Sequence, residues 1–475
     1  MLAVRVICSL ASALFFGVLS ANAEERSVQT NVQVSRATYI LEKIKEADIR
    51  CAQVPLSVTT EVDVPPKSKE SLPVKRITER PVALCAYGEE SKTWHVIHVH
   101  LPSPVPKEYI TCVRNAPTLE ARKECILPHR VVTPGYVLEH IRGYGIVRLT
   151  FNVYVEKVLT LRSGDEPREL RVRGEKLTVY RTRHLWFDDE ALQSGDVDRI
   201  IATASAVNYT PYHIDFGDDE LVVQGADFLF GKVRGAQRAL GLDQNGVRSH
   251  ALPRQALGVV VAWQTPMALA IIEQMDDKTF EADKKSATNA VLIEYALNRD
   301  VAFRFSQSGA NAIGPLQFTD AGGNGTYSAM VREYPEARLE PRFQVGARNL
   351  GEVLKFAIAL IDHEVSRFPE SIPLFKKNPQ IGGAIPVAAY NGGPASGRAL
   401  FAWLKKNRIN IERKQVNIPR SFLIRKTETC PCVNAKTQKI KKKGTVVHFV
   451  SNTETPGYLV KYLYLLNYLA DLGLE

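Results

Sequence analysis

Two segments in the C-terminal half of the chain combine small residues with side chains that bind polar ligands. In 308–318, glycine and alanine let the backbone approach a ligand closely, and the amide of Gln317 both donates and accepts hydrogen bonds. In 388–394, an apolar run ends on Tyr390 and Asn391, and the glycines that follow end a helix. Polar side chains at helix ends beside glycine turns are suited to the amides and hydroxyls of a sugar.

A third segment, 453–461, reads TETPGYLVK and leads into an apolar, aromatic run at 458–472. The chain has no nucleophile elbow, no phosphate-binding glycine loop and no metalloprotease helix. The sequence therefore predicts no cofactor, and no metal ligand among the candidate site residues. Each segment alone resembles an ordinary turn, but the presence of all three in one chain points to a binding site.

The three segments resemble, in the same order, motifs of the superfamily of soluble lytic transglycosylases and goose-type lysozymes. AIGPLQF at 312–318 looks like its glycine and glutamine segment, and AAYNGGP at 388–394 looks like its Ala-Tyr-Asn-Ala-Gly segment. ETPGYLVK at 454–461 is similar to a Glu-Thr-x-x-Tyr-Val-x-Lys stretch. The resemblance runs from near Pro253 to Leu472 and departs from the family in an insertion at about 400–450.

The resemblance implies a helical, lysozyme-like domain that cleaves the MurNAc-GlcNAc β-1,4 bond of peptidoglycan and leaves 1,6-anhydro-MurNAc ends. One glutamic acid would act first as general acid and then as base, and burial would have to raise its pKa. The resemblance also implies that Gln317 contacts an N-acetyl group, that Tyr390 and Asn391 lie at the carboxylate, and that Tyr458 lines the groove.

Two glutamates are candidates for the catalytic acid. Glu273 ends the apolar run 267–272, a context typical of a helix that leads to a groove. Glu294 lies within the apolar run 287–297 and precedes Gly314 by 20 residues (314 − 294), closer to the family's usual spacing than the 41 residues (314 − 273) for Glu273. Neither is followed by the serine that is usual in the family, and both assignments stay open.

Two further functions are compatible with the same motifs. A muramidase would hydrolyse the same bond, and Asp276 or Asp277 could then activate the water molecule. A non-catalytic glycan-binding or scaffold protein would keep the groove without the acid.

The fold class predicted is α+β, with a β-rich N-terminal region followed by a mainly α lysozyme-like domain. The apolar spacing predicts an amphipathic helix over 34–50, and β-branched and aromatic runs predict strands at 95–99, 146–155, 177–180 and 221–223. Helical periodicity begins near 253. The expected organisation is a signal peptide at 1–23, a helix and linker at 24–75, a β-rich domain of unknown role at 76–250 and the catalytic domain at 251–475.

The first 23 residues have the three-part plan of a secretory signal peptide: Arg5, the apolar run Val6–Leu19, and Ala21–Ala23. This leader predicts export to an envelope compartment, most simply a periplasm. The net charge of +10 becomes +9 without Arg5 (10 − 1), which favours anionic partners. In that compartment we expect peptidoglycan strands rather than nucleic acid as the partner, with an envelope protein complex, engaged through the N-terminal region, left open.

The cysteine count also suits an exported protein, since seven cysteines less Cys8 leave an even number. The expected disulfides are Cys51 with Cys85 and Cys112 with Cys125. For Cys430-Pro-Cys432, a structural disulfide, a redox pair and a metal site remain open. The histidines at 95, 98 and 100 are interpreted as a solvated strand face rather than metal ligands.

Overall fold

The computed structural model describes residues 34–63, 74–116, 118, 121–122, 124–142, 148–163, 166–242, 246–308, 310–323, 325–407, 422–433, 440–452 and 454–474. Side chains are described over fewer residues, and those of 422–452 are not among them. The chain divides into two compact units, 1–35 and 36–475, and every contact discussed below lies within the second. The predicted signal peptide and residues 64–73 of the predicted helix and linker region lie outside the described residues.

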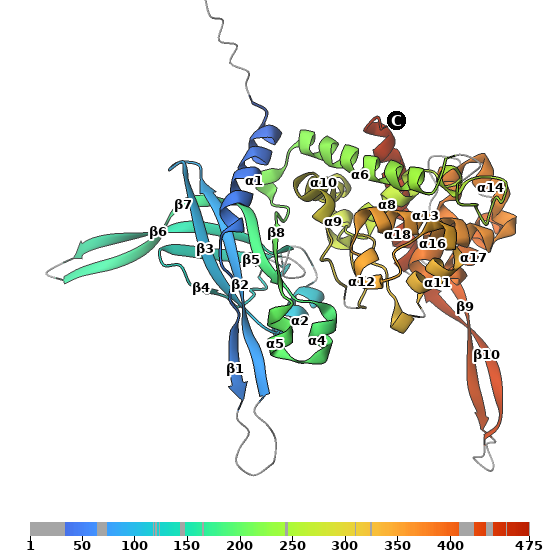
Figure 1. Cartoon of the computed structure of the whole chain (residues 1–475), viewed down its shortest axis with the longest axis horizontal. Helices are drawn as coiled ribbons and strands as arrows, with labels where there is room; N and C mark the ends of the chain where they lie inside the picture. The colour runs from blue at the N-terminus through green and yellow to red at the C-terminus, as the bar shows by residue number, and fades with distance from the viewer. Residues whose placement is uncertain are drawn as a thin grey trace, which may run out of the picture. The chain divides into compact units, whose positions relative to one another are not determined.

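The N-terminal half of the second unit is built on one antiparallel sheet (Figure 1). Its strands are β1 (Thr59–Asp63), β2 (Val74–Gly88), β3 (Thr93–Pro102), β4 (Arg130–Val131), β5 (Tyr136–Arg142), β6 (Thr150–Ser163), β7 (Glu166–Trp186) and β8 (Ser205–Tyr209). They follow the order β4-β3-β2-β7-β6-β5, while β1 pairs with β2 and β8 pairs with β7. The helices of this half are α1 (Arg36–Ala52), α2 (Lys107–Asn115), α4 (Asp189–Ser194) and α5 (Val197–Ala202), with a single turn η2 (Ile214–Phe216).

Strand β2 lies inside the sheet and is buried on both faces. Because successive side chains of a strand point to opposite faces, Val82, Leu84 and Ala86 join one apolar cluster, whereas Cys85 and Tyr87 join another. The second of these clusters also contains one face of α1. The sheet is thus covered on the side of α1 and packed with apolar side chains on the other.

The amphipathic helix predicted at 34–50 is confirmed as α1. Its buried positions are Ala37, Ile40, Ile44, Ala47 and Cys51, spaced three or four residues apart as a single helical face requires. Cys51 at the end of that face is bonded to Cys85 in β2, and Cys112 is bonded to Cys125. Both predicted disulfides are therefore present, and they fit an oxidising compartment.

The C-terminal half is helical, so the chain as a whole is a mixed α and β protein. Its longer helices are α6 (Asp219–Ala239), α8 (Gln264–Ile272), α10 (Lys284–Asn298), α11 (Thr326–Glu333), α13 (Leu350–Ser366), α16 (Ala384–Gly392), α17 (Pro394–Lys406) and α18 (Glu454–Asp471). The shorter ones are α7 (Leu257–Val260), α9 (Asp277–Ala282), α12 (Phe343–Gly346), α14 (Ile372–Lys377) and α15 (Pro379–Gly382), with the turns η3 (Arg299–Val301), η4 (Ala321–Gly323), η5 (Pro335–Ala337) and η6 (Pro369–Ser371).

The strand predicted at 221–223 is wrong, because these residues belong to α6. Asp218 caps this helix, and its side chain accepts hydrogen bonds from the backbone N–H groups of Glu220 and Leu221. The buried positions then recur at helical spacing along 21 residues, and α6 packs against α10 and α13. Tertiary packing and the cap outweigh the strand preference of the paired valines.

The predicted insertion contains a two-stranded antiparallel hairpin, β9 (Phe422–Val433) with β10 (Ile440–Asn452) (Figure 1). Cys430 and Cys432 both lie on β9, and the state of their sulfur atoms falls outside the described side chains. Among the helices that the structure describes, none combines the length and the apolar character needed to cross a membrane.

Candidate functional site

Helix α8 has no polar face, and Glu273 is the residue at which it ends. All its residues from Thr265 to Ile272 are buried, which places this short helix in the middle of the helical half. Glu273 still has helical backbone angles (φ −62°, ψ −20°) and is partly accessible to solvent. The sequence thus places a carboxyl group at the point where an apolar helix leaves the core.

The surroundings of Glu273 favour its neutral form. Burial raises the pKa of this carboxyl to about 7, against the opposing effects of the Tyr458 hydrogen bond and the charge of Lys461. The charges of Glu454 and Asp277 raise this pKa further. Protein atoms therefore surround the carboxyl closely, although part of the residue's surface is still open to water. A group of this kind can give up and take back a proton near neutral pH.

The third motif supplies the direct partner of this carboxyl. The Tyr458 hydroxyl donates to Glu273 Oε1 at 2.6 Å. One turn further along α18, the buried Lys461 donates to the carbonyl oxygen of Met275 at 3.0 Å and pairs with Asp277 at 2.5 Å. Helix α18 is thus bonded both to the acid and to the turn that follows it.

The glycine and glutamine segment is bonded to the same turn. Gln274 is buried and its amide nitrogen donates to the carbonyl oxygens of Gly314 and Pro315, at 3.2 and 2.9 Å. Gln317 also donates to Gly314 O, at 2.7 Å, and remains partly exposed. Gly314 has φ +76°, and a Cβ there would overlap the carbonyl oxygen of Ala347, so the position requires glycine.

Two side chains of the second motif, Tyr390 and Asn391, make hydrogen bonds to the first and third motifs. The Tyr390 hydroxyl donates to the carbonyl oxygen of Leu316, and its ring centroid lies 6.3 Å from that of Tyr458. Asn391 donates to Glu454 Oε1 at 3.3 Å and accepts from the Thr455 hydroxyl at 2.9 Å. Helix α16 is therefore bonded to both other motifs.

The hydroxyl that bonds the Glu273 carboxyl is that of Tyr458, whereas the sequence led us to expect Tyr390 at the carboxylate. The Tyr390 hydroxyl is engaged by Leu316, although burial and the charge of Glu273 both raise the pKa of Tyr390 well above its usual value. Tyr458 comes from the apolar run that the sequence suggested as a groove wall. The three motifs and Glu273 nevertheless form one connected set, in which Glu273, Gln317, Tyr390 and Asn391 are all partly exposed.

Glu294, the rival candidate, belongs to a different environment. It is 3% exposed, accepts from the Tyr209 hydroxyl at 3.0 Å and from the backbone N–H of Tyr212 at 3.2 Å, and lies 3.5 Å from Arg148. None of these partners belongs to the three motifs. Its described contacts are those of a buried carboxylate that ties α10 to the segment after β8.

The aspartates considered for a hydrolytic reaction are engaged elsewhere. Asp276 caps α9 by accepting from the Thr279 N–H at 3.0 Å and pairs with Arg122 at 2.7 Å. Burial alone would raise the pKa of Asp276, but these partners outweigh it and the pKa is lowered. Asp277 is the partner of Lys461, as described above. Glu454 is a further acidic side chain whose charge acts on Glu273, and the sequence does not single it out.

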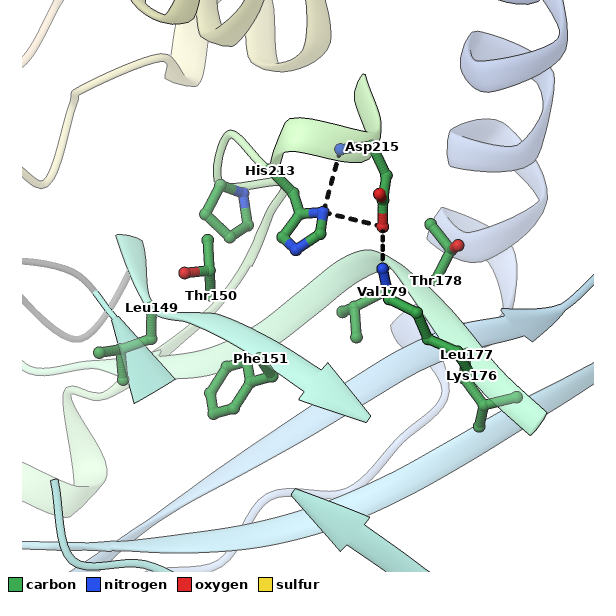
Figure 2. A pocket seen from close by; sticks show the side chains of 10 residues that line it. Leu149, Thr150, Phe151, Lys176, Leu177, Thr178, Val179, His213 and Asp215 are labelled. Atoms are coloured by element: carbon green, nitrogen blue, oxygen red, sulfur yellow. Dashed lines mark hydrogen bonds and ion pairs between the residues drawn. The ribbon is translucent and has the colours of Figure 1, made fainter. Parts of the chain in front are cut away.

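A small hollow elsewhere in the molecule has little capacity for a ligand. It lies between β6, β7 and the turn η2, with space for about one water molecule. In Figure 2, Asp215 points toward Lys176 and His213, and it pairs with them at 2.7 and 3.0 Å. On the sheet, His100 is hydrogen-bonded to Glu79 at 2.7 Å, so this histidine of β3 belongs to the polar contacts around that carboxylate.

Gln274, Glu454 and Lys461 also belong to this site, although the sequence does not predict a role for them. A signal existed for Lys461, because a lysine in an otherwise apolar helical run needs a buried partner. Gln274 stands where the family has serine, so the motif gave no reason to assign it a role.

Comparison of the chain with protein-family models, with curated proteins and with solved structures finds no match.

Proposed function

We propose that this protein is a peptidoglycan lytic transglycosylase, with Glu273 as its general acid and base and with its helical half as a lysozyme-like catalytic region. The observation that carries the proposal is the position of the Glu273 carboxyl at the end of the apolar helix α8, bonded to Tyr458, where burial raises its pKa to about 7. The contacts of the motifs support it as well. Tyr458 of the third motif bonds the carboxyl, Gln274 next to it bonds the first motif, and the second motif is bonded to both of the others, although the motifs are far apart in sequence. Export to a periplasm belongs to the same proposal and is supported by the two disulfides.

The proposed reaction uses one carboxyl group twice. Glu273 first protonates the glycosidic oxygen, the bond from that oxygen to C1 of MurNAc breaks, and GlcNAc leaves as an alcohol. The carboxylate then takes the proton of the MurNAc C6 hydroxyl while O6 bonds to C1. The 1,6-anhydro ring closes without water, and Glu273 is protonated again for the next cycle.

The surrounding residues have distinct parts in this proposal. Tyr458 donates a hydrogen bond that stabilises the carboxylate formed after the first proton transfer. Lys461 is held on the carbonyl oxygen of Met275 and on Asp277, so it contributes positive charge without bonding to the acid. Gln317 keeps its amide oxygen for a ligand, because its nitrogen is the atom that bonds Gly314.

A hydrolytic muramidase is the second candidate function. It is favoured by the presence of a second carboxylate, that of Glu454, whose charge acts on Glu273. An inverting hydrolase needs a second carboxylate about 6.5 to 9.5 Å from the acid to activate water. Glu454 is exposed, and its charge raises the pKa of Glu273. If water is the acceptor, Glu454→Gln should abolish product formation, whereas the transglycosylase reaction should continue in that variant.

The test is digestion of purified peptidoglycan sacculi followed by mass spectrometry of the released muropeptides. The proposal predicts 1,6-anhydro ends from the wild-type protein and a loss of activity of about 100-fold or more in Glu273→Gln. The matched control is Glu294→Gln, which removes a glutamate from the same helical half and should retain the products in its folded fraction.

The other outcomes separate the alternatives. Reducing ends in place of anhydro ends would favour the muramidase. Binding to sacculi without any product would favour a glycan-binding or scaffold protein. Wild-type rates in Glu273→Gln would exclude Glu273 as the acid.

A further inference from the structure

Two histidines and a glutamate from three separate segments meet in the helical half, and the hydrogen bonds that hold them involve none of the residues bonded to Glu273. His250 lies between α6 and α7, Glu333 is the last residue of α11, and His363 lies on α13. One ligating atom of each side chain lies within 4.8 Å of the others. His250 and Glu333 are exposed, and His363 is partly buried.

A buried carboxylate fixes the segments that carry these three side chains. Asp362, next to His363, is fully buried and accepts from the Ser249 hydroxyl at 2.5 Å and from the His250 N–H at 2.7 Å. It also accepts from the Tyr334 hydroxyl at 2.9 Å, immediately after Glu333. One side chain thus holds the loop of His250 and the end of α11 against α13.

The contacts of the two imidazole rings also suit metal binding. The ring of His250 is stacked on Tyr334, with centroids 4.2 Å apart, which limits its rotation. The Nδ1 atom of His363 is buried and has no hydrogen-bond partner. Arg367, which directly follows α13, places a positive charge near this ring, and Glu333 places a negative one there.

We propose that His250, Glu333 and His363 form a binding site for a divalent transition-metal ion, with zinc as the preferred ion. Two imidazoles and one carboxylate are a known zinc ligand set, and the fourth position would be taken by water. The ion would tie the loop before α7 to α11 and α13. This site does not depend on the proposed transglycosylase function.

The geometry is close to what zinc requires. Zinc lies about 2.0 to 2.1 Å from its ligands, so tetrahedral ligand atoms are separated by about 3.4 Å. The present atoms, within 4.8 Å of one another, need to close by at most about 1.4 Å (4.8 − 3.4), which rotation of the exposed Glu333 side chain can supply. The positive charge of Arg367 is offset by its pairing with Glu364 at 3.4 Å.

The test is metal binding by the purified full-length protein after treatment with a chelator. Cobalt(II) is the spectroscopic probe, since tetrahedral coordination gives strong visible absorption, and zinc is then added to displace it. We expect one tightly bound ion per chain. His250→Gln and Glu333→Gln should weaken binding by about 100-fold or more, the scale on which even outer-shell changes act. Both positions are exposed, so these variants should fold.

The control is His98→Gln, which removes a histidine from β3 and should leave cobalt and zinc binding at the wild-type level. Thermal unfolding supplies a second readout, because zinc should raise the melting temperature of wild type and His98→Gln but not of Glu333→Gln. Equal zinc affinity in wild type, His250→Gln and Glu333→Gln would overturn the proposal, as would a wild-type protein that binds neither ion.

Discussion

Replacing Glu273 by glutamine should make the folded protein more stable at neutral and alkaline pH. Glutamine has the same shape, and its amide oxygen can still accept the hydrogen bond from Tyr458. What the variant lacks is the negative charge, which the surroundings of this side chain disfavour. The change therefore isolates the free energy needed to ionise one carboxyl group in the folded protein.

The magnitude follows from the pKa of Glu273. This pKa rises from 4.5 to about 7, and each unit corresponds to about 1.36 kcal/mol, so the total is about 3 kcal/mol. The folded protein binds the proton more tightly than the unfolded chain does. The contribution of Glu273 to stability is therefore fully present below pH 4.5 and is lost as the pH rises through about 7.

The measurement is urea-induced unfolding of wild type and Glu273→Gln at several pH values between 4.5 and 8.5. The difference between the two free energies of unfolding cancels the other titrating groups. It should shift by about 3 kcal/mol in favour of the variant across this range, with most of the change below pH 7. Tyr458→Phe is the companion variant, since it removes a hydrogen bond that lowers this pKa and should move the upper end of the change to higher pH.

A pH-independent difference between wild type and Glu273→Gln would refute the reasoning. It would mean that Glu273 titrates in the folded protein near its ordinary pKa. The carboxyl would then hold a proton in about one molecule in 300 at pH 7, rather than in about half of them. The argument for a general acid at this position would fail with it.

Three further predictions concern stability. Glu294→Gln should lower the free energy of unfolding by roughly 2 kcal/mol, because its buried partners lose a charged acceptor, and urea unfolding measures this. The double variant Cys51→Ser with Cys85→Ser should lose about 4 kcal/mol, as expected for a bridge between residues 34 apart, while reducing agent should have a smaller effect on that variant than on wild type. Gly314→Ala should lose at least about 2 kcal/mol, since the left-handed backbone and the carbonyl oxygen of Ala347 both exclude a Cβ, and its melting temperature should fall accordingly.

The parts of the fold that sequence could predict are those in which local pattern and burial agree. Helix α1 has a regular apolar face, and β3 and the stretch 177–180 of β7 are rich in β-branched and aromatic residues. The failure at 221–223 has a specific physical cause. The two valines favour a strand, but the Asp218 cap and the packing of Leu221 and Val222 against other helices decide the conformation.

For the candidate site, sequence could predict the motifs but not their connections. The number of residues that separate Glu294 from Gly314 is closer to the family's usual spacing and favoured Glu294. The glutamate that is bonded to a motif residue in the structure is Glu273. Spacing along the chain carries no information on which carboxyl ends a buried helix and which is enclosed by Tyr209 and Arg148. The contact between Lys461 and the carbonyl oxygen of Met275 joins residues 186 positions apart, and no local pattern encodes such a pairing.

The contacts of α10 bear on how the chain can be divided for experiment. Gly225 of α6 lies so close to α10 that a Cβ there would overlap the carbonyl oxygen of Leu292. At the end of α10, the buried Asn298 accepts from Arg181 and exchanges hydrogen bonds with the backbone of Thr210. A fragment that starts at residue 251 would contain every motif yet lack these neighbours, and would expose apolar surface. The motif-bearing region is therefore a poor candidate for transplantation, and a useful minimal fragment has to keep the strands beside it.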